Sequence, residues 1–330
     1  MTPDGTAGAG GRTATSRDVA RLAGVSQSSV SLVLNGGGPR HGLSDTTQAR
    51  VRVAAQALGY TPNHAARSLR RQRTSSIAFV TADLGNRYVA EVVTAAEEVA
   101  RARGYAVHVV AAPTEAAEVQ AVARLASGVS DGIILHGDGG RAATLLPLLR
   151  SRFACVLLQD PSEAGDLPCV RVDIAEGGRL ATRHLAALGH RRIAHIADRR
   201  IDGHALNERL DGYRRGLAEA GLAFDTALVV AGENSFAGGD GAMCALLDAA
   251  VPPPTAVFVF NDQMAVGALH ALHARGLRVP RDMAVVGFDG TDLGAFCTPE
   301  LTTIDHPRHE LGRTAANALL DRIEGRPRRY

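Results

Sequence analysis

Residues 15–73 constrain the fold more than any other stretch, because two short helical patterns meet there at a tight turn. Apolar residues recur at helical spacing over 18–23, and Gly24 supplies the left-handed conformation that ends a helix. A second helical pattern covers 27–34. Two short helices joined in this way are typical of a helix-turn-helix module, whose second helix enters the DNA major groove. An ordinary small helical hairpin is the alternative interpretation of these residues.

A third helical pattern and a basic segment follow. Ser44 is suited to cap a helix, apolar residues then follow at i, i+3, i+4 and i+7 up to Leu58, and Gly59 ends the pattern. This predicts a third helix that buries the first two. Pro62 restarts a helix, and the arginine-rich residues 63–73 are too few and too polar to fold alone. We therefore expect a hinge that orders on contact.

Charge is divided unevenly along the chain. Residues 1–75 hold ten arginines against Asp4, Asp18 and Asp45, a balance of +7 in a protein whose net charge is +2. The remainder therefore carries −5. A basic head on an acidic body is typical of a module that binds phosphates.

Composition indicates a soluble, globular chain. The sequence is 45% hydrophobic, yet it contains no run of eighteen apolar residues, so a membrane partner is not expected. Residues 1–14 lack the apolar core of a secretory signal and predict a disordered lead-in, so the protein is expected to stay in the cytoplasm. The four cysteines show no metal-ligand spacing, and no metal or cofactor is predicted.

From Ser75 onward, apolar strand-like runs alternate with amphipathic helical patterns. Unbroken apolar runs in such an alternation favour a parallel sheet covered on both faces. Two series of this kind imply two lobes, with a ligand cleft at the carboxyl ends of the strands. The predicted strands are 77–83, 105–112, 132–137, 154–160, 192–198, 228–232, 256–262 and 283–289, and the predicted helices are near 88–103, 115–127, 141–150, 174–188, 205–220, 237–250, 263–275 and 308–323.

The chain resembles the lactose-repressor-type (LacI/GalR) family of transcription regulators. The resemblance is carried, in the family's order, by DVARLAGVS at 18–26, VSLVLN at 30–35, LGYTPNHAARSL at 58–69, LGHRRIAHIA at 188–197, NDQMAVGAL at 261–269, VVGFDG at 285–290 and LTTI at 301–304. It implies an α/β protein in which a three-helix helix-turn-helix DNA-binding domain and a hinge helix precede a two-lobed, periplasmic-binding-protein-like effector domain with two parallel α/β sheets.

The resemblance also divides the chain into domains. It places the DNA-binding domain at 15–61, the hinge at 62–74 and the effector-binding and dimerisation domain at 75–330. Within that last domain, lobe 1 is expected over about 75–168 and 306–330, and lobe 2 over about 169–305. A homodimer bound to a near-palindromic operator and to a small-molecule effector is the functional expectation, since a twofold protein demands a twofold site.

Family members use the start of the second helix to read base edges. The resemblance therefore assigns base contacts to Gln27, Ser28 and Leu32. Glutamine can pair bidentately with adenine, serine is permissive, and a leucine could touch a thymine methyl but cannot pair with guanine. Backbone contacts are expected from Thr15, Ser16, Ser31, Asn35 and Asn63. For the serines and the threonine, the alternative is a helix cap or a solvated surface group.

The hinge is expected to act in the DNA minor groove. In the family a hinge leucine from each subunit wedges into the operator centre and kinks it, and the matching position here is Leu69, with Ala66 beside it. The alternative is that Leu69 packs against the body of the protein, because a lone leucine among arginines would otherwise be exposed.

The effector residues implied by the family's motifs converge at the cleft. They are polar groups suited to a small polyhydroxylated ligand or a nucleobase, with one aromatic ring for stacking. The set is Tyr88, Gln159, Arg209, Asn261, Asp262, Asp289 and His306. A structural Asp–Arg pair, or helix capping by Asn261 and Asp262, is the alternative interpretation.

Two rival functions fit parts of the sequence. GDGGRA at 137–142 matches a GxGxxA dinucleotide motif, with Asp160 at a distance suited to a ribose contact, and favours an NAD-dependent oxidoreductase. Pro147 inside the helix that should follow, and the unexplained residues 15–73, argue against it. A periplasmic-type sugar-binding protein that does not bind DNA would share the two lobes but not the basic head. The expectation is therefore a regulator, not an enzyme.

Overall fold

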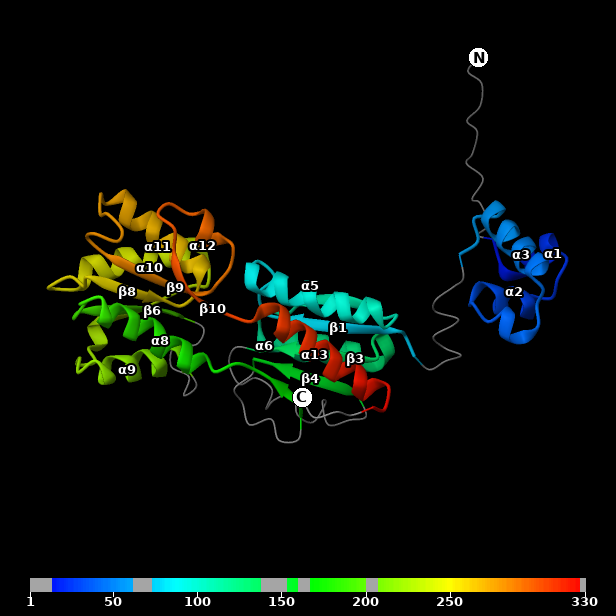
Figure 1. The fold of residues 1–330 in the computed structure, drawn as a ribbon, viewed down its shortest axis with the longest axis horizontal. Coiled ribbons are helices and arrows are strands. Elements are labelled where there is room, and N and C mark those ends of the chain that lie inside the picture. Colours follow the sequence, from blue (N-terminus) through cyan, green and yellow to red (C-terminus); the bar gives the residue numbers. More distant parts are fainter. Residues whose placement is uncertain (1–13, 62–72, 138–152, 160–166, 200–206, 327–330) are drawn as a thin grey trace, which may run out of the picture. The chain divides into compact units, whose positions relative to one another are not determined.

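The computed structural model describes residues 14–61, 73–137, 153–159, 167–199 and 207–326. The chain divides into two compact units, Met1–Gln72 and Arg73–Tyr330 (Figure 1). The unit boundary therefore falls two residues before the predicted end of the hinge. Hydrogen bonds explain this difference, since Thr74 N donates to the Asp131 carboxylate (2.6 Å) and Arg73 Nη2 donates to the Ile323 carbonyl (2.8 Å).

The first unit consists of three α-helices, α1 (Ser16–Ala23), α2 (Gln27–Leu34) and α3 (Asp45–Ala57), with a 3-10 turn η1 (Pro39–His41) before the last. Each helix begins at a hydroxyl cap, Thr15, Ser26 and Ser44, and Gly24 ends α1 at φ 63°. The core is small and aliphatic: Val19, Ala20, Ala23, Val30, Val33, Val51, Ala54 and Ala55. The predicted three-helix module is thus present in the described residues.

In the second unit, the first lobe is built on a parallel sheet of strand order β2-β1-β3-β4-β5. Its strands are β1 (Ser76–Thr81), β2 (Ala106–Ala111), β3 (Gly132–His136), β4 (Ala154–Leu158) and β5 (Cys169–Val170). Alternate residues of β1 face opposite sides, so Phe79 packs with α5 (Arg87–Ala102) and α13 (Arg308–Ile323), whereas Val80 packs with α6 (Glu115–Arg124) and the π-helical turn η2 (Leu125–Val129).

The second lobe repeats the design with strand order β10-β9-β8-β6-β7. Its strands are β6 (Ile193–Asp198), β7 (Val229–Gly232), β8 (Ala256–Val259), β9 (Ala284–Asp289) and β10 (Thr302–Asp305). Helices α8 (Ile174–Ala187) and α9 (Glu208–Glu219) cover one face, and α10 (Phe236–Ala249) and α11 (Asp262–Ala274) cover the other (Figure 1). The short η3 (Thr226–Leu228) and α12 (Leu293–Phe296) complete the lobe.

Two strands were missing from the sequence prediction. Strand β5 pairs with β4, so the first lobe extends to residue 170 and not to 168 as predicted. Strand β10 pairs with β9 in the second sheet. Both strands are short, and β10 (TTID) holds a single large apolar residue instead of an apolar run, so pattern alone did not separate them from loops. The chain passes between the lobes after β5 and again between β10 and α13, as the prediction for the last helix requires.

Candidate functional site: a recognition helix and a pocket between two lobes

The start of α2 is exposed in the helix-turn-helix. Ser26 Oγ accepts a hydrogen bond from Ser29 N (3.1 Å), which fixes where the helix begins. Val30 and Val33 point into the core, while Gln27 and Ser28 are exposed and Leu32 is half-buried. Gln27 and Ser28, which are predicted to read bases, are therefore accessible at the start of the helix, and the apolar Leu32 lies one turn further along.

The candidate backbone contacts have intramolecular partners. Thr15 forms a capping box with Asp18, in which Thr15 Oγ1 donates to Asp18 Oδ2 (2.6 Å). Ser16 Oγ accepts from Gln27 Nε2 (2.7 Å), and Asn35 Nδ2 donates to the Ser31 carbonyl (2.6 Å). The capping interpretation thus holds for Thr15, and Ser16 orients a predicted base reader. Asn63, Ala66 and Leu69 lie outside the described residues.

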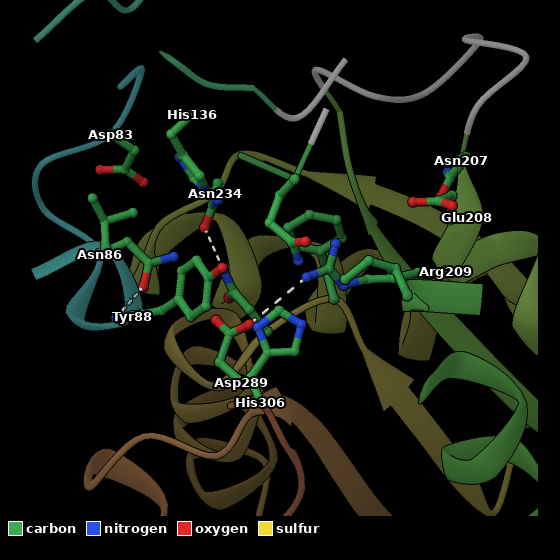
Figure 2. A pocket seen from close by; sticks show the side chains of 15 residues that line it. Asp83, Asn86, Tyr88, His136, Asn207, Glu208, Arg209, Asn234, Asp289 and His306 are labelled. Atoms are coloured by element: carbon green, nitrogen blue, oxygen red, sulfur yellow. Dashed lines mark hydrogen bonds and ion pairs between the residues drawn. The ribbon is translucent and has the colours of Figure 1, made fainter. Parts of the chain in front are cut away.

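Both lobes line a pocket in the second unit (Figure 2). It encloses about 670 Å³ of non-atom space, part of it open to solvent, and most of its lining is polar. The strand ends and helix starts of the two sheets supply the lining, as expected for open α/β sheets. The lining residues are Asp83, Asn86, Tyr88, Val89, His136, Gln159, Ile174, Asn207, Glu208, Arg209, Asn234, Phe260, Asn261, Asp289 and His306.

Arg209 is the cation at the centre of the second lobe's wall. Its guanidinium carbon lies 4.1 Å from the Phe260 ring centroid and 4.4 Å from that of Phe288, and Arg209 Nη2 is 3.7 Å from Asp289 Oδ1. Asp289 itself is buried, and its φ of 106° is a backbone conformation that residues other than glycine rarely adopt. Ring stacking and the nearby carboxylate together hold the Arg209 guanidinium in one place. Backbone strain such as that at Asp289 is often found at ligand-binding sites.

Three rings form the opposite part of the wall. Tyr88 in α5 packs against His306, at 5.0 Å between ring centroids, and against His136 at 5.9 Å. His306 belongs to the segment that joins β10 to α13, so it touches structure from both lobes. Relative motion of the lobes would therefore change the surroundings of these rings.

Six of the seven predicted effector residues line this pocket: Tyr88, Gln159, Arg209, Asn261, Asp289 and His306. Asp262, also predicted to contact the effector, is the exception and does not line the pocket. Its carboxylate accepts hydrogen bonds from Thr291 N (2.7 Å), Thr291 Oγ1 (2.8 Å) and Thr303 Oγ1 (2.5 Å), which tie α11 to β10 and to the loop after β9. Burial raises the pKa of this carboxyl group, against the effect of those hydrogen bonds. Asp262 thus stabilises the second lobe from behind the pocket wall.

Several pocket residues escaped the sequence analysis. Asn86 and Asn207 are helix caps, and Asn234 lies directly before the cap of α10. Each follows a strand and precedes a helix, the place where cleft residues of an open sheet are expected, and that spacing could have found them. Asp83, His136 and Glu208 complete the polar lining that was not predicted.

The described residues form neither a metal site nor a membrane-spanning helix. No group of three or more His, Cys, Asp or Glu side chains is placed there to hold a metal ion. Helices long and apolar enough to cross a membrane are likewise absent from that part of the chain. The GDGGRA motif falls largely in residues 138–152, outside the described structure.

Known families match both units. Residues 15–63 match the model described as bacterial regulatory proteins, lacI family, and residues 182–329 match the periplasmic binding protein-like domain. The ribose operon repressor of Escherichia coli (strain K12) is 36% identical over 318 residues, which cover 94% of this chain and 93% of that protein. The transcriptional repressor CytR of the same strain is 33% identical over 314 residues, which cover 94% of this chain and 90% of that protein.

Solved structures agree with these matches. The lac repressor dimer bound to operator and the anti-inducer ONPF is similar with a TM-score of 0.83 and 29% identity, over 96% of this chain and 94% of that one. A complex of the transcriptional regulator CelR with cellobiose has a TM-score of 0.69 and 33% identity over the same shares. With an exposed recognition helix, a two-lobed pocket and these similarities, the chain belongs to the lacI family of bacterial regulatory proteins and is an effector-controlled, DNA-binding transcriptional regulator.

Proposed function

We propose that this protein is a homodimeric repressor that binds a near-palindromic operator and changes its operator affinity when a neutral sugar occupies the pocket. The observation that carries the proposal is the pocket itself, in which polar groups from two lobes surround the Arg209–Asp289 pair. Relatives named for ribose and a neighbour solved with cellobiose favour a sugar over a nucleobase. A bacterial regulator of this kind would act in the cytoplasm, where its operator lies.

On the DNA side, Gln27 and Ser28 are the proposed base readers, with Leu32 against a thymine methyl. Ser16, Ser31 and Asn35 are the proposed phosphate contacts, together with Asn63. Because Ser16 Oγ already holds Gln27 Nε2, the glutamine keeps its side-chain oxygen for an adenine amino group. Its position at the exposed start of α2 supports this role.

The hinge stays a proposal resting on the family resemblance, with Leu69 and Ala66 as the minor-groove residues. Leu69→Ala should lower operator affinity by about tenfold or more and reduce DNA bending, because a wedge between base steps is lost. Sugar affinity should be unchanged, since the pocket lies in the second unit. Fluorescence anisotropy with a labelled operator, beside a sugar titration, tests this; unaltered operator binding would show that Leu69 is no wedge.

Coupling requires the effector to prefer one arrangement of the lobes. Two polar contacts join the lobes in the arrangement of this structure. Arg87 Nη2 in α5 lies 2.6 Å from Asp292 Oδ2 in the second lobe, and Arg308 donates to the carbonyl of Asp289. A sugar that hydrogen-bonds both lobes would favour the arrangement that keeps these contacts.

The direct test selects duplexes from a randomised library with the full-length protein at low ionic strength. The proposal expects an enriched motif with twofold symmetry. Mobility shifts on that motif are then repeated with D-ribose, cellobiose and other neutral sugars, one of which should change the midpoint by tenfold or more, the range of ordinary allosteric coupling. Recovery of an asymmetric motif, or a midpoint that no sugar moves, contradicts the proposal.

A further inference from the structure

The carboxylate of Asp131 holds the backbone at the start of the second unit. Its Oδ1 accepts hydrogen bonds from Thr74 N (2.6 Å) and from Thr74 Oγ1 (2.9 Å), and its Oδ2 accepts one from Ser75 N (2.9 Å). Hydrogen bonds to an ionised acceptor are roughly twice as strong as neutral ones. Asp131 lies directly before β3, and its own N–H donates to the carbonyl of Ser76 in β1 (2.8 Å). The contacts of this residue therefore fix Thr74 and Ser75 against the first sheet.

Ser75 is held in a conformation that serine rarely adopts. Its φ is 52°, in the left-handed region that favours glycine. The Ser75 N–H is bound by Asp131, and the Ser75 carbonyl accepts from Ala106 N at the start of β2 (3.0 Å). Such a conformation persists only where the surrounding bonds over-determine it. The backbone of Ser75 thus has one orientation, which sets the direction in which the chain enters β1.

Arg73 makes a second contact with the first lobe. Its Nη2 donates to the carbonyl of Ile323, the last residue of α13 (2.8 Å). That helix end is itself fixed, because Arg103 pairs with Asp321 (2.8 Å) and with Glu324 (2.7 Å). Figure 1 shows that α13 ends on the side of the first lobe where the chain enters β1. Residues 73–75 are consequently attached to both a sheet and a helix.

These contacts lie where the second unit begins. The first unit, with the helix-turn-helix, ends at Gln72, and β1 begins at Ser76. A dimer that reads two half-sites must present its two DNA-binding units at one spacing. If residues 73–75 were free, operator binding would have to order them, and ordering the backbone of one residue lowers affinity by a factor of about five to thirty. Residues that are ordered before binding avoid this loss of affinity.

Charge argues against a direct contact of Asp131 with DNA. A carboxylate repels phosphate, so removal of its charge would, by electrostatics alone, raise the affinity for any duplex. A role in holding Thr74 and Ser75 predicts the opposite change, and only for DNA that requires both DNA-binding units to be placed correctly. The sign of the effect therefore separates the two roles.

We propose that Asp131 is a positioning residue for operator binding. Its carboxylate holds Thr74 and Ser75 so that the chain leaves each body of the dimer in one direction toward the DNA-binding unit, and Arg73 strengthens this attachment. The inference rests on the proposed operator binding by a homodimer. It uses no property of the pocket, so the identity of the effector does not affect it.

Asp131→Asn tests this role. Asparagine keeps one oxygen but places an NH₂ group against a backbone N–H, where neither group can accept a hydrogen bond. Thr74→Val removes only the hydroxyl donor, and Thr74→Ser keeps it. Glu97→Gln is the matched control for charge, since Glu97 lies in α5 of the same lobe and its carboxylate accepts from the exposed Arg101 (3.1 Å).

Fluorescence anisotropy measures the affinity of each full-length protein for two duplexes over a range of salt concentrations. One duplex carries the symmetric motif recovered from the randomised library, and the other has the same base composition in scrambled order. Thermal midpoints recorded without DNA show whether each variant is folded.

Asp131→Asn should bind the symmetric duplex about five- to thirtyfold more weakly than the unaltered protein, and Thr74→Val about two- to tenfold more weakly. Thr74→Ser and Glu97→Gln should bind it as tightly as the unaltered protein does. For Asp131→Asn and Thr74→Val, the affinity for the scrambled duplex and the slope of log affinity against log salt should be unchanged, because no phosphate contact is lost.

A folded Asp131→Asn protein that binds the symmetric duplex as tightly as the unaltered protein, or more tightly, would overturn the inference and leave the proposed function standing. Equal losses of affinity for both duplexes would overturn it as well. Where Asp131→Asn does not fold, Thr74→Val decides in its place by the same criteria. If the unaltered protein enriches no symmetric motif, the inference and the proposed homodimeric operator binding both fail.

Discussion

Single residues of the pocket serve two purposes at once. Asn86, Asn207 and Asn261 each cap a helix through the side-chain oxygen and offer the nitrogen elsewhere. Asp289 closes a strand in a rarely adopted conformation and pairs with Arg209. Because each of these side chains both fixes local structure and lines the pocket, a test of a substitution must distinguish an effect on binding from an effect on folding.

Arg209→Ala should abolish the response to sugar and spare operator binding by the effector-free protein. The loss removes a charge-assisted donor, worth roughly 1.5–3 kcal/mol or ten- to hundredfold in affinity. Calorimetric titration and mobility shifts measure the two effects separately. Arg214→Ala on the same helix is the control, since Arg214 is exposed over Phe224 away from the pocket lining. Loss of operator binding as well would assign Arg209 to folding.

Buried His195 predicts a pH dependence of stability. Burial lowers its pKa to about 4 from 6.5, and its ring is stacked on Tyr213 and Phe258. The folded state thus keeps the imidazole neutral while the unfolded chain binds a proton below pH 6.5. The free energy of unfolding should therefore fall as pH drops from 6.5 toward 4, by up to about 1.4 kcal/mol per pH unit from this group.

His195→Phe removes that contribution. Urea denaturation at pH 7 and pH 5 should show a smaller difference in the variant than in the unaltered protein. An equal difference in both proteins would mean that His195 is not the group responsible.

At the scale of elements, close helix crossings set the shape of each lobe. A Cβ on Gly212 of α9 would lie 2.1 Å from the Ala175 carbonyl of α8, and one on Gly312 of α13 would lie 2.2 Å from the Val92 carbonyl of α5. Only glycine allows backbones to approach so closely. The helices that carry Arg209 and Tyr88 into the pocket are placed by these crossings.

Gly212→Ala should therefore lower the free energy of unfolding by about 1–3 kcal/mol, as expected for overpacking against a backbone. Sugar affinity should fall with it, because α9 must shift. Gly241→Ala is the matched control. Gly241 lies on the exposed side of α10, where an added Cβ would have nothing within 4 Å, and the substitution should stabilise the protein by up to about 1 kcal/mol through helix propensity. Chemical denaturation measures the free energy of unfolding of both variants. Equal values for Gly212→Ala and Gly241→Ala would refute the packing argument.

For the whole molecule, the energetic balance between lobe arrangements decides regulation. Side chains of Arg87 and Asp292 are both about half exposed, at 53% and 47%, so their ion pair is weak but lies between the lobes. A weak contact is sufficient to affect the balance between lobe arrangements, since the free energy of allosteric coupling is only about 1–3 kcal/mol.

Arg87→Asp should weaken sugar binding by up to about fivefold, because exposed pairs contribute roughly 0.2–1 kcal/mol. Adding Asp292→Arg should restore the affinity by re-forming the pair with reversed charges. Calorimetry at low and at high salt measures the sugar affinity of the single and double variants. The effect of each charge reversal on that affinity should be smaller at high salt, because salt screens the ion pair. Additive losses in the double variant would exclude a coupling between these residues.

The sequence by itself determined most of the elements and their order. Apolar runs such as 132–137 predicted strands, cap residues and Gly24 placed the helices of the first unit, and the family's motifs named six residues that line the pocket. Local signals suffice there, since periodicity and capping act within one element.

Only the tertiary structure decided which atoms face the ligand. Asp262 and Asn261 are neighbours in sequence, yet one ties α11 to β10 and the other lines the pocket. The side-chain amides of Gln159 and Asn207 are oriented by the backbone N–H groups of Val172 and Leu210, and the short strands β5 and β10 exist because a longer neighbour offers its edge. A hydrogen bond between elements depends on distances that no local pattern encodes, which is why these features appear only once the lobes are packed.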